Sequence, residues 1–127
     1  MTHPRMTPVA ALSIALALVA ATPGCGGICT NAPVATIPSP SGKNKAVVFH
    51  RTCGAGTEVN TQVAVIPSYS SLSNIPGNTL ILTGDVPLDV RWTSDTSLAI
   101  SGMGAAPVSK QVESVAGIAI EYATPAQ

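Results

Sequence analysis

The sequence has few charged and few aromatic side chains, and these shortages already argue against several classes of protein. Charged residues make up 9% and aromatic residues 3% of the 127 residues, and the formal net charge is zero. A nucleic-acid-binding protein needs a basic face, which this balance does not supply. The sequence also lacks a polybasic cluster that would attract anionic lipid. We therefore expect no nucleic-acid partner, and any membrane attachment has to come from another source.

The chain also has little of the chemistry on which enzymes and metal sites depend. Beyond the N-terminal apolar segment it holds one histidine, His50, and no Gly-x-Ser-x-Gly motif. His50 and Cys53 lie three positions apart on a predicted strand, so their side chains would point to opposite faces. The acids Asp85, Asp89 and Asp95 are typical of turns and solvated strand faces, and do not suggest a glycosidase pair. We expect no enzyme activity, no cofactor and no metal ion.

What the N-terminus does contain is an export signal. The segment "MTHPRMTPVAALSIALALVAATPGC" carries Arg5 and no acid, followed by an apolar run from Val9 to Ala21. This run of 13 residues is shorter than the roughly 20 that span a bilayer. The pattern predicts a secretory signal peptide over residues 1–24.

The end of this signal resembles the lipobox of bacterial lipoproteins, in which small residues precede a cysteine that receives lipid. Here the segment is Thr22, Pro23, Gly24 and Cys25. The resemblance implies lipidation of Cys25 and an N-terminal lipid anchor. Gly26 is not an Asp-type retention signal, so we expect the periplasmic face of the outer membrane in a two-membrane host. The alternative is cleavage after Ala21 without lipid.

The sequence contains three cysteines, and an odd number in an exported protein leaves one to explain. If Cys25 carries lipid, Cys29 and Cys53 are left to form a disulfide, which an exported compartment permits. Spacing alone leaves two alternatives open, unpaired Cys25 and Cys29 or a Cys25–Cys53 bridge. A metal site that combines the three cysteines with His50 is a less favoured interpretation.

The remainder of the chain has the alternating pattern of β-strands. In "KAVVFHRTC", Val47, Phe49 and Arg51 share one face, and Val48 and His50 share the other. No window outside the signal shows a sustained helical period. Six strands are predicted, over residues 45–53, 61–67, 79–83, 86–93, 97–101 and 117–122. A seventh, at the edge of the sheet, is predicted over residues 32–37.

We therefore predict an all-β domain, a small antiparallel sheet or sandwich of about six or seven strands with one disulfide. Residues 25–38 form a tether and linker in this prediction, and residues 39–127 form the β-domain. Because Trp92 is the one tryptophan, on the strand with the cleanest alternation, we expect it at the centre of the core. We expect Phe49 beside it, on the inward face of the same sheet.

The order of these motifs resembles an uncharacterised family of small bacterial exported proteins, many of them lipoproteins. The stretch that carries the resemblance is "SPSGKNKAVVFHRTCGAGT", followed by "TQVAVIP", "VRWTSDTSLAI" and "GIAIEY", over residues 39–122. Ser41 replaces the usual Asp of the first turn, and Gly56 stands where Thr is common. The resemblance supports the fold and the export, and it implies no particular activity.

Two residues are candidates for binding. Arg51 is expected either at the sheet edge or paired with Glu58 or Glu121, with recognition of an anionic group as the alternative. Tyr69 lies in the turn-rich segment "SYSSLSNIPGN". We expect an exported, lipid-anchored envelope protein with a binding or structural role. The alternative is an inhibitor or immunity protein that acts on an envelope enzyme through the loop around Tyr69.

Overall fold

The computed structural model describes residues 28–123, and within this range the chain forms strands, turns and loops without a helix. Accordingly, nothing in this range is a helix long and apolar enough to cross a membrane. The strands in this range are β1 (Thr30–Pro38), β2 (Asn44–Thr52), β3 (Asn60–Pro67), β4 (Leu80–Thr83), β5 (Asp89–Ser94), β6 (Ser97–Ser101), β7 (Val108–Gln111), β8 (Ser114–Val115) and β9 (Ile118–Tyr122).

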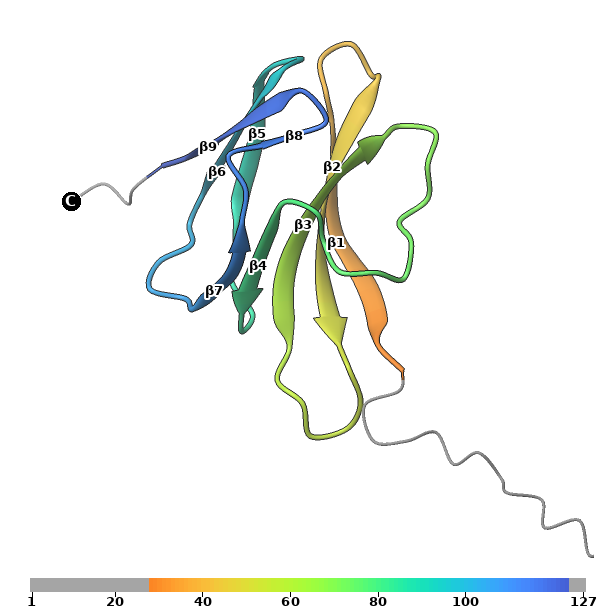
Figure 1. Cartoon of the computed structure of the whole chain (residues 1–127), viewed down its shortest axis with the longest axis vertical. Coiled ribbons are helices and arrows are strands. Elements are labelled where there is room, and N and C mark those ends of the chain that lie inside the picture. The colour runs from red at the N-terminus through yellow and green to blue at the C-terminus, as the bar shows by residue number, and fades with distance from the viewer. Residues whose placement is uncertain (1–27, 124–127) are drawn as a thin grey trace, which may run out of the picture.

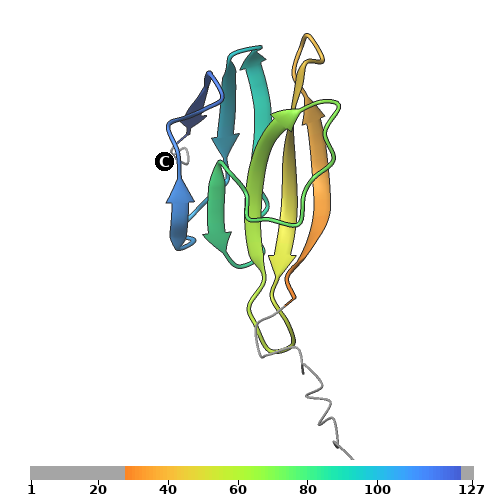
Figure 2. The ribbon, with the colours of Figure 1, turned by 45° about the vertical axis from the view of Figure 1, so that its right-hand side comes forward.

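The strands form two sheets that pack face to face, as Figures 1 and 2 show. The five-stranded sheet has the order β1-β2-β3-β4-β7, and the four-stranded sheet has the order β5-β6-β9-β8. Neighbouring strands are antiparallel except β6 and β9, which are parallel. The predicted all-β fold with one disulfide is confirmed.

The described residues contain more strands than the sequence predicts. Strands β7 and β8 are short and mostly exposed, so they lack the alternation that reveals a half-buried strand. Strand β1 lies within residues 25–38, for which the sequence predicts a tether and one edge strand. Strand β5 begins at Asp89 rather than at residue 86, because residues 84–88 cross from one sheet to the other.

The main core lies between the two sheets and is aliphatic. Its most deeply buried members are Val63, Leu80, Leu82, Leu98 and Ile100, each fully shielded from solvent. These side chains come from the central strands of both sheets, where period-two alternation turns every second residue inward. The core therefore depends on branched aliphatic packing, in keeping with a sequence poor in aromatic rings.

The predicted position of Trp92 at the core centre is wrong. Trp92 lies on β5, an edge strand of the four-stranded sheet, and it is only partly buried where it packs against the main core. Its indole Nε1 donates a hydrogen bond of 2.8 Å to the carbonyl oxygen of Ile37 on β1. An indole N–H needs an acceptor when it is buried, and this position at the rim provides one.

The predicted position of Phe49, beside Trp92 on one inward face, is also wrong. Phe49 is fully buried, but on the outer face of the five-stranded sheet, in a separate cluster with Val47 and Ala64. Leu72 packs against this cluster from the loop 68–79, which lies across the sheet in both views (Figures 1 and 2). Strand β2 is therefore buried on both faces, and its alternation alone does not show which face meets the main core.

Candidate functional site

A groove of about 460 Å³ lies in the described part of the molecule, where the edges of the two sheets face each other. It lies between β1, the edge of the five-stranded sheet, and the segment 85–90, which leads into β5. We call it the β1/β5 groove. Its lining consists of Val34, Ala35, Ile37, Val48, His50, Asp85, Val86, Pro87, Leu88, Asp89 and Val90.

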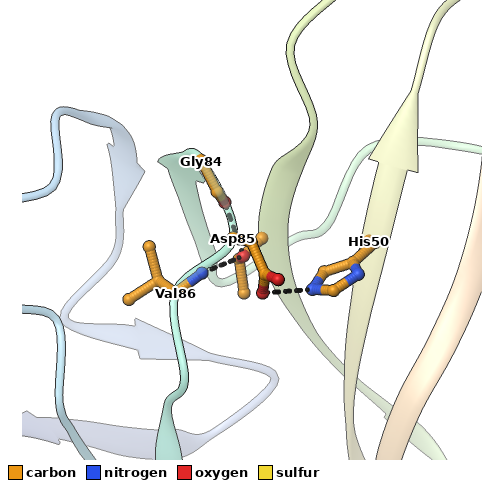
Figure 3. A network of polar contacts seen from close by, with 5 residues as sticks. His50, Gly84, Asp85 and Val86 are labelled. Atoms are coloured by element: carbon orange, nitrogen blue, oxygen red, sulfur yellow. Dashed lines mark hydrogen bonds and ion pairs between the residues drawn. The ribbon is translucent and has the colours of Figure 1, made fainter.

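Two polar residues meet at this groove from positions far apart in the sequence. His50, on β2, contacts Asp85, in the turn after β4, with 3.0 Å between Nε2 and Oδ1 (Figure 3). The side chain of His50 is 29% exposed and that of Asp85 is 71% exposed. The pair is therefore open to solvent and to a ligand.

A buried threonine places Asp85 in this position. Thr61, on β3, is fully buried, and its hydroxyl donates to the carbonyl oxygen of Gly84 at 2.7 Å. The same hydroxyl oxygen accepts a hydrogen bond from the backbone N–H of Val86 at 2.9 Å. These two bonds hold the turn on both sides of Asp85, whose carboxylate faces the imidazole in Figure 3. Sequence reasoning missed Thr61, although its place in the alternation of β3 predicts that it is buried.

The His50–Asp85 pair has the geometry of a base and its orienting acid, but not of a nucleophilic triad. Such a triad requires a hydroxyl or thiol on the second imidazole nitrogen. Among residues 28–123, no side-chain hydroxyl or thiol is hydrogen-bonded to the imidazole of His50, whose contact is with Asp85. Cys53, the thiol three positions from His50 in the sequence, is held in a disulfide. What the groove offers is an apolar surface with polar groups at its rim, the usual character of a small-molecule site.

Arg51 lies on the other face of β2, where it is 9% exposed. The predicted pairing with Glu58 or Glu121 is wrong, because its Nη1 donates to the side-chain oxygens of Asn31 and Asn74 at 2.7 and 3.0 Å. The expected position at an exposed sheet edge is wrong as well, since the side chain is buried under these contacts. Arg51 thus joins strand β1 to the loop 68–79.

The two asparagines extend this connection. Asn31 Nδ2 donates to the carbonyl oxygens of Ser73 and Ile75, and Asn74 Nδ2 donates to the carbonyl oxygen of Cys29. We call Arg51, Asn31 and Asn74 the asparagine clamp. Neither asparagine stands out in the sequence, because each acts through backbone groups more than 40 positions away.

Tyr69 is the most exposed large hydrophobic side chain described, at 90%. It lies in a tight turn, because the N–H of Ser70 donates to the carbonyl oxygen of Pro67 at 3.0 Å. At the other end of the loop, the side chain of Asn78 bonds both the N–H and the carbonyl of Val65. Together with the asparagine clamp, these contacts hold the loop that presents Tyr69.

The disulfide joins Cys29 to Cys53, and this pairing excludes the alternative Cys25–Cys53 bridge. It connects the residue before β1 to the residue after β2. Cys25, the predicted lipidation site, and the signal peptide lie outside the described residues. Within residues 28–123, no group of three histidine, cysteine or acidic side chains is placed to hold a metal ion.

Asp95 lies in the turn between β5 and β6, as its sequence context predicts. Its carboxylate Oδ1 accepts a hydrogen bond of 2.8 Å from the backbone N–H of Ser41, in the turn between β1 and β2. Hydrogen bonding from Ser41 lowers the pKa of Asp95, with a smaller contribution from the charge of Lys43. This contact joins the β1–β2 turn of one sheet to the β5–β6 turn of the other, so it stabilises the packing of the two sheets.

Comparisons with protein-family models, with curated proteins and with solved structures found no match for this chain.

Proposed function

We propose that this chain is an exported bacterial envelope protein, anchored by lipid on Cys25, whose β-sandwich binds other molecules and does not catalyse a reaction. The proposal includes the periplasmic face of the outer membrane as its location in a two-membrane host. It also includes membership of the family of small exported proteins that the sequence resembles.

The single observation that carries the proposal is the Cys29–Cys53 disulfide. Disulfides persist in exported compartments and are rare in the cytosol, so the bond supports export. It also accounts for two of the three cysteines and leaves the chemistry of Cys25 to be explained. Because Cys25 lies four positions before the disulfide, a lipid on its thiol would hold the sandwich close to the membrane surface.

The anchor is tested by the intact mass of the full chain expressed in a bacterial host. We expect loss of residues 1–24 and the added mass of acyl chains, with the protein in the membrane fraction. A Cys25→Ala variant provides the control and should carry no acyl mass. A wild-type product that begins at Thr22 without lipid would show that the anchor is wrong.

A second candidate function, that of an inhibitor or immunity protein, is favoured by Tyr69. Protein inhibitors commonly present a side chain on a loop that is already held in its bound shape, because this reduces the entropy lost on binding. Tyr69 is 90% exposed, and its loop is held at Asn74 and Asn78. An exposed tyrosine is also among the residue types enriched at interface hot spots.

This second function is tested by immobilising the mature protein and measuring the activity of any envelope enzyme that it retains. We expect that Tyr69→Ala weakens both retention and inhibition by about tenfold or more, the scale of a hot-spot residue. Val108→Ala is a matched control, because Val108 is an exposed hydrophobic residue on β7, at 46%. Equal effects of the two variants would argue against a role for Tyr69.

A further inference from the structure

The interior of the β1/β5 groove is apolar. Of its eleven lining side chains, eight are aliphatic or proline, and the exceptions are His50, Asp85 and Asp89. Val48 and Val90 are buried, at 5% and 8% exposure, and both belong to the main core. The packing of the core therefore fixes the base of the groove. A volume of about 460 Å³ lies within the range of pockets that hold small molecules.

The rim of the groove carries negative charge. Asp85 and Asp89 are both exposed, and the lining, all of it from described residues, includes no lysine or arginine. Oδ1 of Asp85 faces His50, which leaves the second carboxylate oxygen for another donor. The one other titratable residue in the lining is His50, which contacts Asp85 and is uncharged unless protonated. An apolar interior below two carboxylates is complementary to an apolar group that carries a positive charge.

The bordering edge of β1 is poorly suited to pairing with an added peptide strand. Pro33 has no N–H to donate, and Val34 has no partner in the register of β1 with β2, which marks a β-bulge. The Trp92–Ile37 hydrogen bond joins β1 to β5 along the same side. Prolines and bulges are features that protect sheet edges from further strands. An occupant would therefore be held by side chains in the groove and not by backbone pairing.

We propose that the β1/β5 groove is a binding site for small cationic amphiphiles, molecules with a single apolar chain and a positively charged head. The chain lies on Val48, Val86 and Val90, and the head lies between the carboxylates of Asp85 and Asp89. This gives a ligand class to the binding role proposed above, and it rests on that role. It does not depend on lipidation of Cys25, so the failure of one proposal can be told from the failure of the other.

The test compares two probes of equal chain length and opposite charge, dodecyltrimethylammonium and dodecanoate, below the concentrations at which they form micelles. The protein is the mature chain from residue 25 with Cys25→Ser. Trp92 is the one tryptophan in the sequence and lies beside Ile37 of the groove, so its fluorescence reports binding. Amide chemical shifts of Ala35, Val48 and Val86 locate the site.

We expect the cationic probe to bind about tenfold or more tightly than the anionic one, because each nearby carboxylate attracts the first and repels the second. The double variant Asp85→Asn, Asp89→Asn should bring the two affinities to within about twofold. Glu121→Gln is the matched control, since Glu121 is an exposed acid on β9 outside the groove, and it should leave the ratio unchanged.

Three results would overturn the proposal: equal affinity for both probes, shifts centred away from the groove, or a ratio that the double variant does not change. Urea unfolding of each variant first establishes that it is folded. If the double variant is unfolded, Asp89→Asn alone serves as the test, because Asp89 is exposed at the start of β5 and lies outside the turn that Thr61 holds. Asp89→Asn alone should halve the logarithm of the ratio between the affinities for the cationic and the anionic probe.

Discussion

At the residue scale, four consecutive side chains of β2 have four different environments. Val48 faces the main core, Phe49 faces the outer cluster, His50 borders the groove and Arg51 belongs to the asparagine clamp. Alternation predicts correctly that Phe49 and Arg51 share a face and that Val48 and His50 share the other. The environment of each residue is set by what covers that face.

A substitution series on β2 checks these assignments. We expect Phe49→Ala to lower the free energy of unfolding by about 3 to 5 kcal/mol, the usual loss for a buried aromatic side chain. His50→Ala should lower it by less than about 1 kcal/mol, because the imidazole is partly exposed and its partner Asp85 is mostly exposed. Urea unfolding measures both, with Tyr69→Ala as an exposed control. The reverse order would mean that the stretch is organised around His50.

At the scale of elements, the two hairpin turns at one end of the sandwich hold the sheets together. Figures 1 and 2 show the β1–β2 turn and the β5–β6 turn at the same end of the molecule. The Ser41 N–H bond to Asp95 links them, across 54 positions of sequence. At the neighbouring strand ends, Trp92 is bonded to Ile37. The edge strands β1 and β5 are therefore held together at this end, and the β1/β5 groove lies further along these two strands.

The Asp95 contact predicts a specific dependence of stability on pH. Hydrogen bonding from Ser41 lowers the pKa of Asp95 in the folded state below its ordinary value of 3.8. Its contribution is therefore fully present above that value and is lost as the pH falls through the lower folded-state pKa. Asp95→Asn should remove this part of the acid sensitivity and leave the profile above about pH 5 parallel to that of wild type. Urea midpoints between about pH 2 and pH 7 measure it, and parallel profiles over the whole range would contradict it.

At the scale of the whole molecule, the disulfide and the asparagine clamp act on the same corner. The disulfide joins the ends of β1 and β2, and the clamp joins β1 to the loop that covers the outer cluster. Strand β1 is mostly exposed on both faces, so it buries little apolar surface by itself. Its attachment therefore relies on pairing with β2, on the disulfide and on the clamp.

Removal of the disulfide should be costly for a domain of this size. In the chain-entropy description, a disulfide between positions 24 apart raises the free energy of unfolding by about 3 kcal/mol. This is a large share of the total free energy of unfolding of a small domain, which is usually about 5 to 15 kcal/mol. We expect the paired variant Cys29→Ala, Cys53→Ala to lose about this much in urea unfolding. The reduced wild-type protein is the control and should behave alike. Unchanged stability in both would show that the clamp and the strand pairing hold β1 without the bond.

The local features of this protein can be predicted from its sequence, because they depend on neighbouring residues. Period-two alternation identified β2, β3, β4 and β6, and the expectation of a disulfide between Cys29 and Cys53 came from a count of three cysteines. The positions of Tyr69 in an exposed turn and of Asp95 in a hairpin turn follow from turn composition. None of these depends on which face of a sheet meets the other sheet.

Features that require distant segments to meet are visible in the folded molecule and not in the sequence. Leu72 covers the outer face of the five-stranded sheet, so Phe49 is buried away from Trp92 and the core is centred on aliphatic residues. The groove and its His50–Asp85 pair exist because residues 84–88 cross between the sheets beside β2. The alternation of a strand is the same whichever layer covers each of its faces. It therefore predicts which side chains share a face, but not which segment packs against that face.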